Sequence, residues 1–246
     1  MTSIALYNLK GGVGKTASAV NLAYLAAADG YKTLLWDVDQ QGSSSYYYKV
    51  KPKQYSSIKN VLQKDADLSS TICTTDFELL DILPADNTVK SADAIHHEMQ
   101  QSKNGIKQVL KALQKEYEFI IIDCPPGFSL LTQNVWNAVD IVLMPTISTT
   151  LSLRTYTMVK EYAKETGLDL KKLMCFFTMV DLRKTLHNEV LGDLLKDKNF
   201  FNNYIPYLSD VEKMGIHKAP IMEYANSSYA AQCYRNLWAE IKEGVL

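Results

Sequence analysis

Short apolar runs recur along this chain, and most are separated by segments with the composition and periodicity of helices. The runs predict buried strands at residues 4–8, 33–36, 79–83, 119–122, 141–144 and 174–179. The intervening segments predict helices at residues 17–28, 106–117, 130–139, 153–166 and 189–196. Strands that are apolar throughout are covered on both faces, so we expect an α/β fold with a mostly parallel central sheet flanked by helices on both faces.

Size and charge narrow the class of protein. With 246 residues, 47% of them apolar, the chain can bury a full core, and we expect one domain over residues 1–246. The net charge of −1 gives no whole-molecule attraction to nucleic acid or anionic lipid, so a basic surface would have to be a local patch. The sequence has no secretory signal, no apolar run long enough to cross a bilayer and no C-x-x-C spacing, so we expect a cytoplasmic protein without a zinc site.

A glycine-rich segment, KGGVGKT at residues 10–16, lies between the first predicted strand and the first predicted helix. Backbone N–H groups at a helix N-terminus bind anions, and glycines let the main chain approach phosphate oxygens. Lys15 would reach the β- and γ-phosphates, and Thr16 would offer its hydroxyl to Mg²⁺. A standard P-loop has glycine where this chain has Leu9. The predicted nucleotide-binding residues here are Lys10, Gly11, Gly12, Val13, Gly14, Lys15, Thr16 and Ala17.

The second lysine gives the loop a family resemblance: KGGVGKT resembles the deviant Walker A loop of the ParA/MinD ATPases, in which the first lysine is the signature lysine. The stretch DVDQQG at residues 37–42 resembles the family's Walker A′ motif, which implies that Asp39 orients the attacking water. FIIID at residues 119–123 looks like a Walker B strand, which implies that Asp123 holds a Mg²⁺ water. The resemblance runs through nearly the whole chain and implies a single P-loop NTPase domain.

The resemblance also implies a mechanism. ATP with Mg²⁺ would join two subunits, with Lys10 of each crossing to the partner's nucleotide, and hydrolysis would release them. The implied catalytic residues are Lys10, Lys15 and Asp39, and the implied metal-site residues are Thr16 and Asp123. In ParA-like proteins the regions matching residues 177–181 and 205–206 form the adenine pocket. Met179, Asp181 and Pro206 are therefore candidates, although core packing explains Met179 equally well.

The expected function is that of a ParA-type ATPase that binds DNA nonspecifically as an ATP dimer. A ParB-like partner would stimulate hydrolysis, and the protein would segregate or position a plasmid, chromosome or large protein cargo. While ATP is bound, the protein would associate with the nucleoid. The first strand starts near the N-terminus, so we expect the short ParA class. Family arginines are replaced by Tyr207 and Leu208, and scattered solvated charge is the alternative to a DNA-binding patch. The candidate DNA-binding residues are Arg183, Lys184, Lys213, Lys218 and Arg235.

Three alternatives remain open. A MinD-like membrane-cycling regulator would use the apolar stripe of the last helix, but its charges balance, and docking on the core with no stable membrane anchor is favoured. The stripe consists of Tyr234, Leu237, Trp238, Ile241 and Val245. A P-loop enzyme acting on a small metabolite would not need Lys10. Cys124, beside Asp123, suggests a third alternative, a relative of the nitrogenase iron protein, which shares an iron–sulfur cluster between its subunits. Because the sequence offers no clear second ligand, we favour the interpretation of Cys124 as a small buried residue.

The segment at residues 46–103 is expected to contribute helices and loops outside the sheet. It begins with Tyr46, Tyr47 and Tyr48 beside a lysine cluster at Lys49, Lys51 and Lys53. These tyrosines could stack on nucleic acid, but partly buried aromatics beside a solvated lysine face are favoured.

Overall fold

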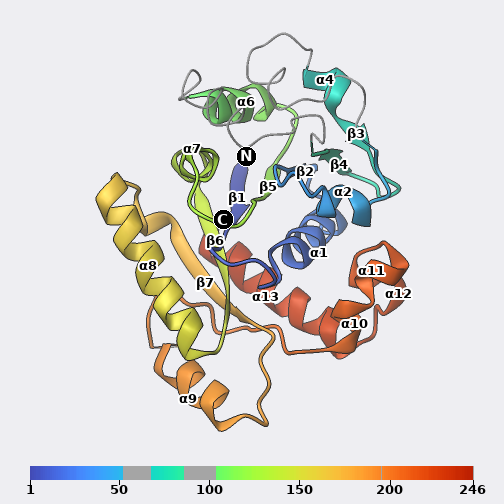
Figure 1. Cartoon of the computed structure of the whole chain (residues 1–246). Helices are drawn as coiled ribbons and strands as arrows, with labels where there is room; N and C mark the ends of the chain where they lie inside the picture. Colours follow the sequence, from blue (N-terminus) through green and yellow to red (C-terminus); the bar gives the residue numbers. More distant parts are fainter. Residues whose placement is uncertain (52–67, 86–103, 195, 246) are drawn as a thin grey trace.

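The computed structural model describes residues 1–51, 68–85, 104–194 and 196–245. Its strands are β1 (Thr2–Leu6), β2 (Thr33–Asp37), β3 (Cys73–Thr74), β4 (Leu80–Leu83), β5 (Phe119–Asp123), β6 (Ile141–Ile147) and β7 (Leu173–Thr178). They form one sheet in the order β3-β4-β2-β5-β1-β6-β7 (Figure 1). All neighbours are parallel except β3 and β4.

Helices cover both faces of this sheet (Figure 1). The longer ones are α1 (Lys15–Ala28), α6 (Gly105–Leu113), α7 (Leu130–Ala138), α8 (Thr150–Thr166), α9 (Thr185–Leu194) and α13 (Tyr229–Val245). The short ones are α2 (Ser43–Tyr47), α4 (Leu68–Thr71), α10 (Ser209–Glu212), α11 (Met214–His217), α12 (Ile221–Tyr224) and the 3₁₀ turn η1 (Leu170–Lys172). The predicted α/β class and the six predicted strands are confirmed, with bounds shifted by up to three residues.

The strand at the β3 edge is a correction, because the expectation placed most of residues 46–103 outside the sheet. β3 is only two residues long and pairs antiparallel with β4, so it leaves no apolar run in the sequence. Lys53 and residues 52–67 and 86–103 lie outside the described part of the chain.

Burial of both sheet faces explains why β5 is apolar at four successive positions. Ile120 and Ile122 pack into one core cluster together with residues of α6, α7 and α8. Phe119 and Ile121 pack into the other cluster, with α1 and α13. Side chains alternate between the two faces along a strand. In a strand that is covered on both faces, every position is therefore buried and apolar side chains are favoured throughout.

The last helix uses its apolar stripe for packing. Tyr234, Leu237, Trp238 and Ile241 are each at most 2% exposed and belong to the cluster that includes α1. Docking on the core is thereby confirmed for these four residues, while the side chain of Val245 lies outside the described part. Among the described residues, no helix has the length and apolar character that crossing a membrane requires.

The tyrosine triplet is divided between core and surface. Tyr48 is 4% exposed and donates a hydrogen bond to the Val20 carbonyl, whereas Tyr46 is 50% exposed. This agrees with the interpretation of partly buried aromatics.

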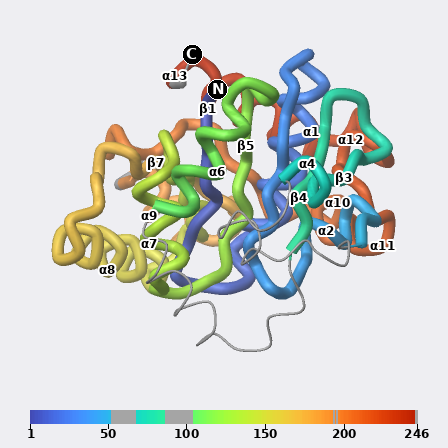
Figure 2. The backbone as a smooth tube through the Cα atoms, turned by 90° about the horizontal axis from the view of Figure 1, so that it is seen from above, coloured from blue at the N-terminus to red at the C-terminus, as the bar shows by residue number. Residues whose placement is uncertain are grey.

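The sheet brings the polar strand ends to one side. Figure 2 shows the start of β1 and the end of α13 at the same end of the fold, which leaves the carboxyl ends of the parallel strands at the other. β1 lies between β5 and β6, and β5 lies between β1 and β2. Segments that follow β1, β2 and β5 therefore meet at one edge, where ligands bind in open α/β sheets.

Candidate nucleotide-binding site

The segment at residues 10–16 has the predicted context: it follows β1 and ends where α1 begins at Lys15. Gly12 and Gly14 have left-handed backbones, with φ of +72° and +85°. A side chain built on Gly11 or Gly12 would meet nothing within 4 Å, so the loop's outer surface is open. The loop thus offers backbone N–H groups at a helix N-terminus to an anion.

Lys15 lies inside the loop rather than in solvent. It is 6% exposed, and its Nζ donates to the Lys10 carbonyl at 3.0 Å. Burial lowers its pKa, while the carboxylates of Asp123 and Asp39 oppose that shift. A buried ammonium with one backbone partner gains by meeting an anion, because its desolvation is then offset.

Lys10 has a different environment. Its Nζ donates to the Leu151 carbonyl in the first turn of α8 at 3.0 Å, on the surface. Its backbone N–H donates to Asn8 Oδ1 at 2.9 Å. Within one subunit the Lys10 ammonium therefore contacts α8, and its crossing to a partner stays a prediction.

Two carboxylates, Asp37 and Asp123, lie side by side at the ends of β2 and β5, where they are register partners. They are 2% and 0% exposed. Ser44 Oγ donates to Asp123 Oδ2 at 2.7 Å, and Ser45 donates to Asp37 Oδ2 from its N–H at 2.9 Å and its hydroxyl at 2.8 Å. The Oδ1 atom of each carboxylate has no hydrogen-bond partner among the described residues.

Burial is the main reason that both carboxylates hold protons tightly. It raises the pKa of Asp37 to about 7, with a further rise from Asp123, against hydrogen bonds from Ser45. It raises the pKa of Asp123 to about 6, against hydrogen bonds from Ser44 and Thr16. Two unpaired oxygens in a low-dielectric site favour a cation, and carboxylate with hydroxyl oxygen is a donor set that suits Mg²⁺.

Asp39 lies farther out than Asp37, half-buried, in the turn before α2. Its Oδ1 accepts from the Gln41 N–H at 3.0 Å, and Gly42 ends the turn with a left-handed backbone. Its charge affects the pKa of Asp123 and of Lys15, so it lies near both. We call residues 10–16 with Asp37, Asp39 and Asp123 the P-loop rim.

Sequence reasoning missed the side chains that hold this rim together. Ser44 and Ser45 fix the two buried carboxylates, and their signal was the serine run that follows the Walker A′ stretch. Asn8 and Thr178 tie the loop to neighbouring strands: Asn8 Nδ2 donates to the Pro145 carbonyl at 2.7 Å, and Thr178 Oγ1 donates to the Val13 carbonyl at 2.9 Å. No local sequence pattern marked these two residues.

The adenine candidates lie together beside the loop. Val180 and Pro206 form a parallel bridge, with Val180 N–H donating to the Ile205 carbonyl at 3.2 Å, so Met179, Asp181 and Pro206 converge. Met179 has a left-handed backbone, with φ of 52°, and is only partly buried. Asp181 is engaged by Arg183 at 2.8 and 2.9 Å, which lowers its pKa to about 2. Their contact with adenine stays a prediction.

The five candidate DNA-binding residues do not form one patch. Arg183 and Lys184 precede α9, Lys213 and Lys218 flank α11, and Arg235 lies in α13. Figures 1 and 2 both place α9 and α11 on opposite flanks of the sheet. Four of the five also have partners within the chain. Arg183 binds Asp181, Lys213 binds Asp210 at 3.1 Å, Arg235 binds Asn226, and the Lys218 ammonium lies 4.5 Å from the centre of the Tyr46 ring.

Cys124 behaves as a small buried residue. It is 1% exposed, and burial raises the pKa of its thiol. Among the described residues, no group of three or more His, Cys, Asp or Glu side chains is arranged to hold a metal ion.

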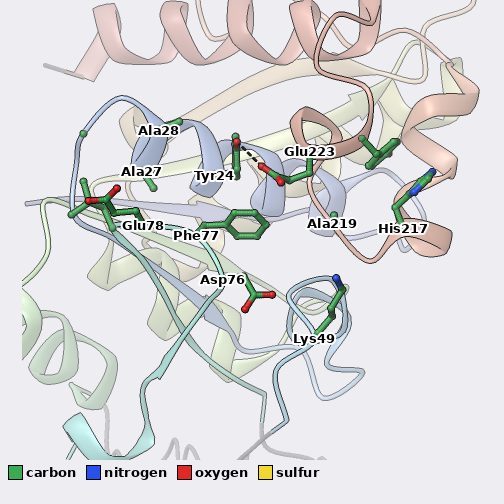
Figure 3. Close-up of a pocket in the computed structure, with 13 residues that line it drawn as sticks. Tyr24, Ala27, Ala28, Lys49, Asp76, Phe77, Glu78, His217, Ala219 and Glu223 are labelled. Atoms are coloured by element: carbon green, nitrogen blue, oxygen red, sulfur yellow. Dashed lines mark hydrogen bonds between the residues drawn. The ribbon is translucent and has the colours of Figure 1, made fainter.

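A groove of about 800 Å³ lies away from the P-loop rim, along the second half of α1. Figure 3 shows Tyr24, Phe77 and Glu223 around it, with Lys49 and Asp76 on one side. The Tyr24 hydroxyl donates to Glu223 Oε1 at 2.8 Å. The residues that line it are Tyr24, Ala27, Ala28, Gly30, Lys49, Asp76, Phe77, Glu78, Leu79, His217, Ala219, Glu223 and Tyr224.

Comparisons with known proteins agree with this geometry. The family model of an AAA domain matches residues 1–172. The chain is 31% identical over 246 residues to the sporulation initiation inhibitor protein Soj of Bacillus subtilis, with 97% of each covered. It is 33% identical over 247 residues to the chromosome-partitioning ATPase Soj of Treponema pallidum, covering 97% of this chain and 96% of the relative. The septum site-determining protein MinD of Pyrococcus horikoshii, solved with Mg-ADP, has the same fold at a TM-score of 0.76 and 24% identity, covering 98% of this chain and 95% of that one.

Proposed function

Because this chain belongs to the ParA/MinD family of P-loop ATPases, we propose that it is a ParA-type positioning ATPase. It dimerises on ATP, binds DNA nonspecifically in that state, and hydrolyses ATP to ADP and phosphate when a ParB-like partner stimulates it. The cycle moves or places a plasmid, a chromosome or a large protein cargo. The protein works in the cytoplasm and associates with the nucleoid while ATP is bound.

The observation that carries this proposal is the meeting of Lys15 and two buried carboxylates at a glycine-rich helix N-terminus. Lys15 is 6% exposed and has a neutral backbone carbonyl as partner. A triphosphate would supply the negatively charged partner that its ammonium lacks. Asp123 Oδ1 has no partner among the described residues, and the Thr16 hydroxyl reaches the same carboxylate. These oxygens fit Mg²⁺, which when bound neutralises charge on the β- and γ-phosphates.

The loop residues and Asp39 then have distinct tasks. The N–H groups of residues 11–16 and the Lys15 ammonium hold the phosphates, and Asp39 orients the attacking water in line with the leaving oxygen. Lys10 leaves the Leu151 carbonyl and reaches the γ-phosphate of the partner subunit. An arginine finger likewise supplies a cation from a partner subunit, and it raises the hydrolysis rate by a factor of about 10³–10⁵.

The signature lysine also separates this proposal from its alternatives. A P-loop enzyme acting on a metabolite has no use for Lys10, and its ATP turnover would require that metabolite. A MinD-like cycle on membranes needs an exposed amphipathic tail, whereas Tyr234, Leu237, Trp238 and Ile241 are buried against the core. Co-sedimentation with anionic liposomes or with plasmid DNA, each with and without ATP, distinguishes the MinD-like cycle from the ParA-type cycle.

A complementation experiment tests the trans role of Lys10 directly. Lys10→Ala and Asp39→Ala chains are assayed separately and then mixed in equal amounts before ATP is added. In a mixed dimer the nucleotide on the Lys10→Ala chain has its own Asp39 and receives Lys10 from the partner. In a single turnover, random pairing should then release about one quarter as much phosphate as the wild type, because half of the dimers contain one complete site.

The control is each variant mixed with itself at the same total concentration. Lys10→Ala should still bind ATP, as followed by a fluorescent analogue, and should not hydrolyse it. A mixture no more active than its components would refute the trans role, since a lysine acting on its own nucleotide cannot be supplied by a partner.

A further inference from the structure

We propose that Asn8 is a positioning residue. It fixes the backbone position of the signature lysine, Lys10, so that the Lys10 ammonium can reach the partner's nucleotide. Asn8 does not touch nucleotide in this scheme; it acts through Lys10. The inference rests on the proposed function, because it requires that Lys10 act in trans.

Both ends of the Asn8 amide are used: its bond to Pro145 is buried, and its bond from the Lys10 N–H is partly buried. The side chain is 2% exposed. Its Oδ1 accepts from the Lys10 N–H at 2.9 Å, and its Nδ2 donates to the Pro145 carbonyl of β6 at 2.7 Å. The backbone of Lys10 is thereby fixed against β6, and breaking either bond leaves a buried polar group without a partner.

The other two contacts of Lys10 cannot last through the catalytic cycle. Its carbonyl accepts from Lys15 Nζ at 3.0 Å, and Lys15 is the residue that turns to the phosphates. Its own Nζ donates to the Leu151 carbonyl at the surface, and that bond breaks when the ammonium crosses to the partner. The bonds of Asn8 involve no group that the nucleotide recruits, so they can persist when ATP is bound.

A second tie to the same loop provides a matched comparison. Thr178 is 3% exposed, and its hydroxyl donates to the Val13 carbonyl at 2.9 Å, in the middle of the phosphate cradle. Thr178 therefore supports the part of the loop that binds the subunit's own nucleotide. Asn8 supports the residue that serves the partner's nucleotide.

The test uses Asn8→Ala, and Asn8→Asp as a variant of the same shape whose carboxylate cannot donate to the Pro145 carbonyl. Each should fold, as judged by circular dichroism, and should bind a fluorescent ATP analogue within about twofold of the wild type. Turnover at saturating ATP should fall by about 10²-fold, because a misplacement of about 1 Å has that effect on a positioned group. This split between affinity and rate is not expected of a residue that only supports the cradle.

Complementation then assigns the site at which Asn8 acts. Mixed with Asp39→Ala, the Asn8→Ala chain should recover activity, since it keeps its own Asp39 and receives a well-placed Lys10 from the partner. Mixed with Lys10→Ala, it should not, because the lysine that it offers is misplaced. Thr178→Val, the matched control, should give the opposite pattern: recovery with Lys10→Ala and none with Asp39→Ala.

Three results would overturn the inference while leaving the proposed function intact. One is an Asn8 variant that behaves like Thr178→Val in these mixtures, and another is turnover equal to the wild type. The third is loss of folding or of ATP binding in both Asn8 variants, which would make Asn8 a structural residue. If Lys10→Ala and Asp39→Ala themselves fail to complement, the proposed trans mechanism fails first, and Asn8 has no partner site to serve.

Discussion

The P-loop rim and the groove of Figure 3 lie at opposite ends of α1, and they differ in how their polar groups are placed. At the rim, Lys15, Asp37 and Asp123 are at most 6% exposed, and two carboxylate oxygens have no partner among the described residues. In the groove, Lys49, Asp76, Glu78, His217 and Glu223 are all exposed to water. Water already solvates the groove's charges, whereas the charges at the rim depend on a ligand.

The difference shows that hollow volume alone does not identify this site. The groove measures about 800 Å³, but none of its lining residues belongs to a motif that the sequence singled out for phosphate chemistry. The rim is an open loop surface whose N–H groups, ammonium and carboxylates converge from three chain segments. Buried polar groups without partners are the better mark of a functional site, since folding alone does not favour them.

The largest difference should appear with Asp39→Ala at the rim and Asp76→Ala in the groove. If Asp39 orients the attacking water as proposed, the Asp39→Ala chain should hydrolyse ATP about 10²–10⁴-fold more slowly, and its ATP-bound dimers should fail to dissociate. Steady-state phosphate release and a sizing column with ATP measure the two effects. Equal rates for the two variants would remove the functional distinction between the regions.

A smaller but still large effect is expected on nucleotide affinity. Lys15→Ala should weaken ATP binding by about 100-fold or more, which corresponds to loss of a charge-assisted contact worth about 3 kcal/mol. Titration with a fluorescent ATP analogue measures it. Lys49→Ala, which removes a lysine from the groove, is the control and should bind ATP as the wild type does.

The buried carboxylates predict a pH-dependent change in stability. The pKa of Asp37 is raised from 3.8 to about 7, so the folded chain holds this proton more tightly than the unfolded chain does. The stabilising contribution is present at low pH and is lost as the pH rises toward 7. At pH 8, Asp37→Asn should therefore raise the free energy of unfolding by about 4 kcal/mol, with a smaller gain at pH 5.

Urea denaturation in the presence of a chelator measures this change, because a bound cation would compensate the charge. Asp76→Asn, an exposed carboxyl in the groove, should show no comparable dependence on pH. An equal gain for Asp37→Asn at both pH values would mean that the carboxyl is not held as an acid in the folded chain.

The smallest effect is expected for the groove's own hydrogen bond. Glu223→Gln weakens the contact with the Tyr24 hydroxyl at a water-exposed position, so ATP affinity and turnover should stay within about twofold of the wild type. Isothermal titration and phosphate release check both. A larger effect would join the groove to the nucleotide site and end the contrast between the two regions.

Much of this site could be predicted because its signals are local. KGGVGKT, DVDQQG and FIIID each place their functional residue at the end of an apolar strand, and a strand's end is visible in the sequence. β3 was missed because a two-residue edge strand buries too little to leave a pattern. Asn8 and Thr178 were missed because their partners, Pro145 and Val13, lie far along the chain.

The sequence by itself determined six of the strands, the longer helices between them, the phosphate loop and the residues that carry charge. Apolar periodicity and glycine spacing are properties of neighbouring residues, so they can be read without a fold. Only the tertiary structure decided that Asp37 and Asp123 are register partners, that Lys15 is buried, and that the candidate basic residues lie on separate flanks. Burial, register and distance arise when distant segments pack together, and the physical chemistry of the site depends on them.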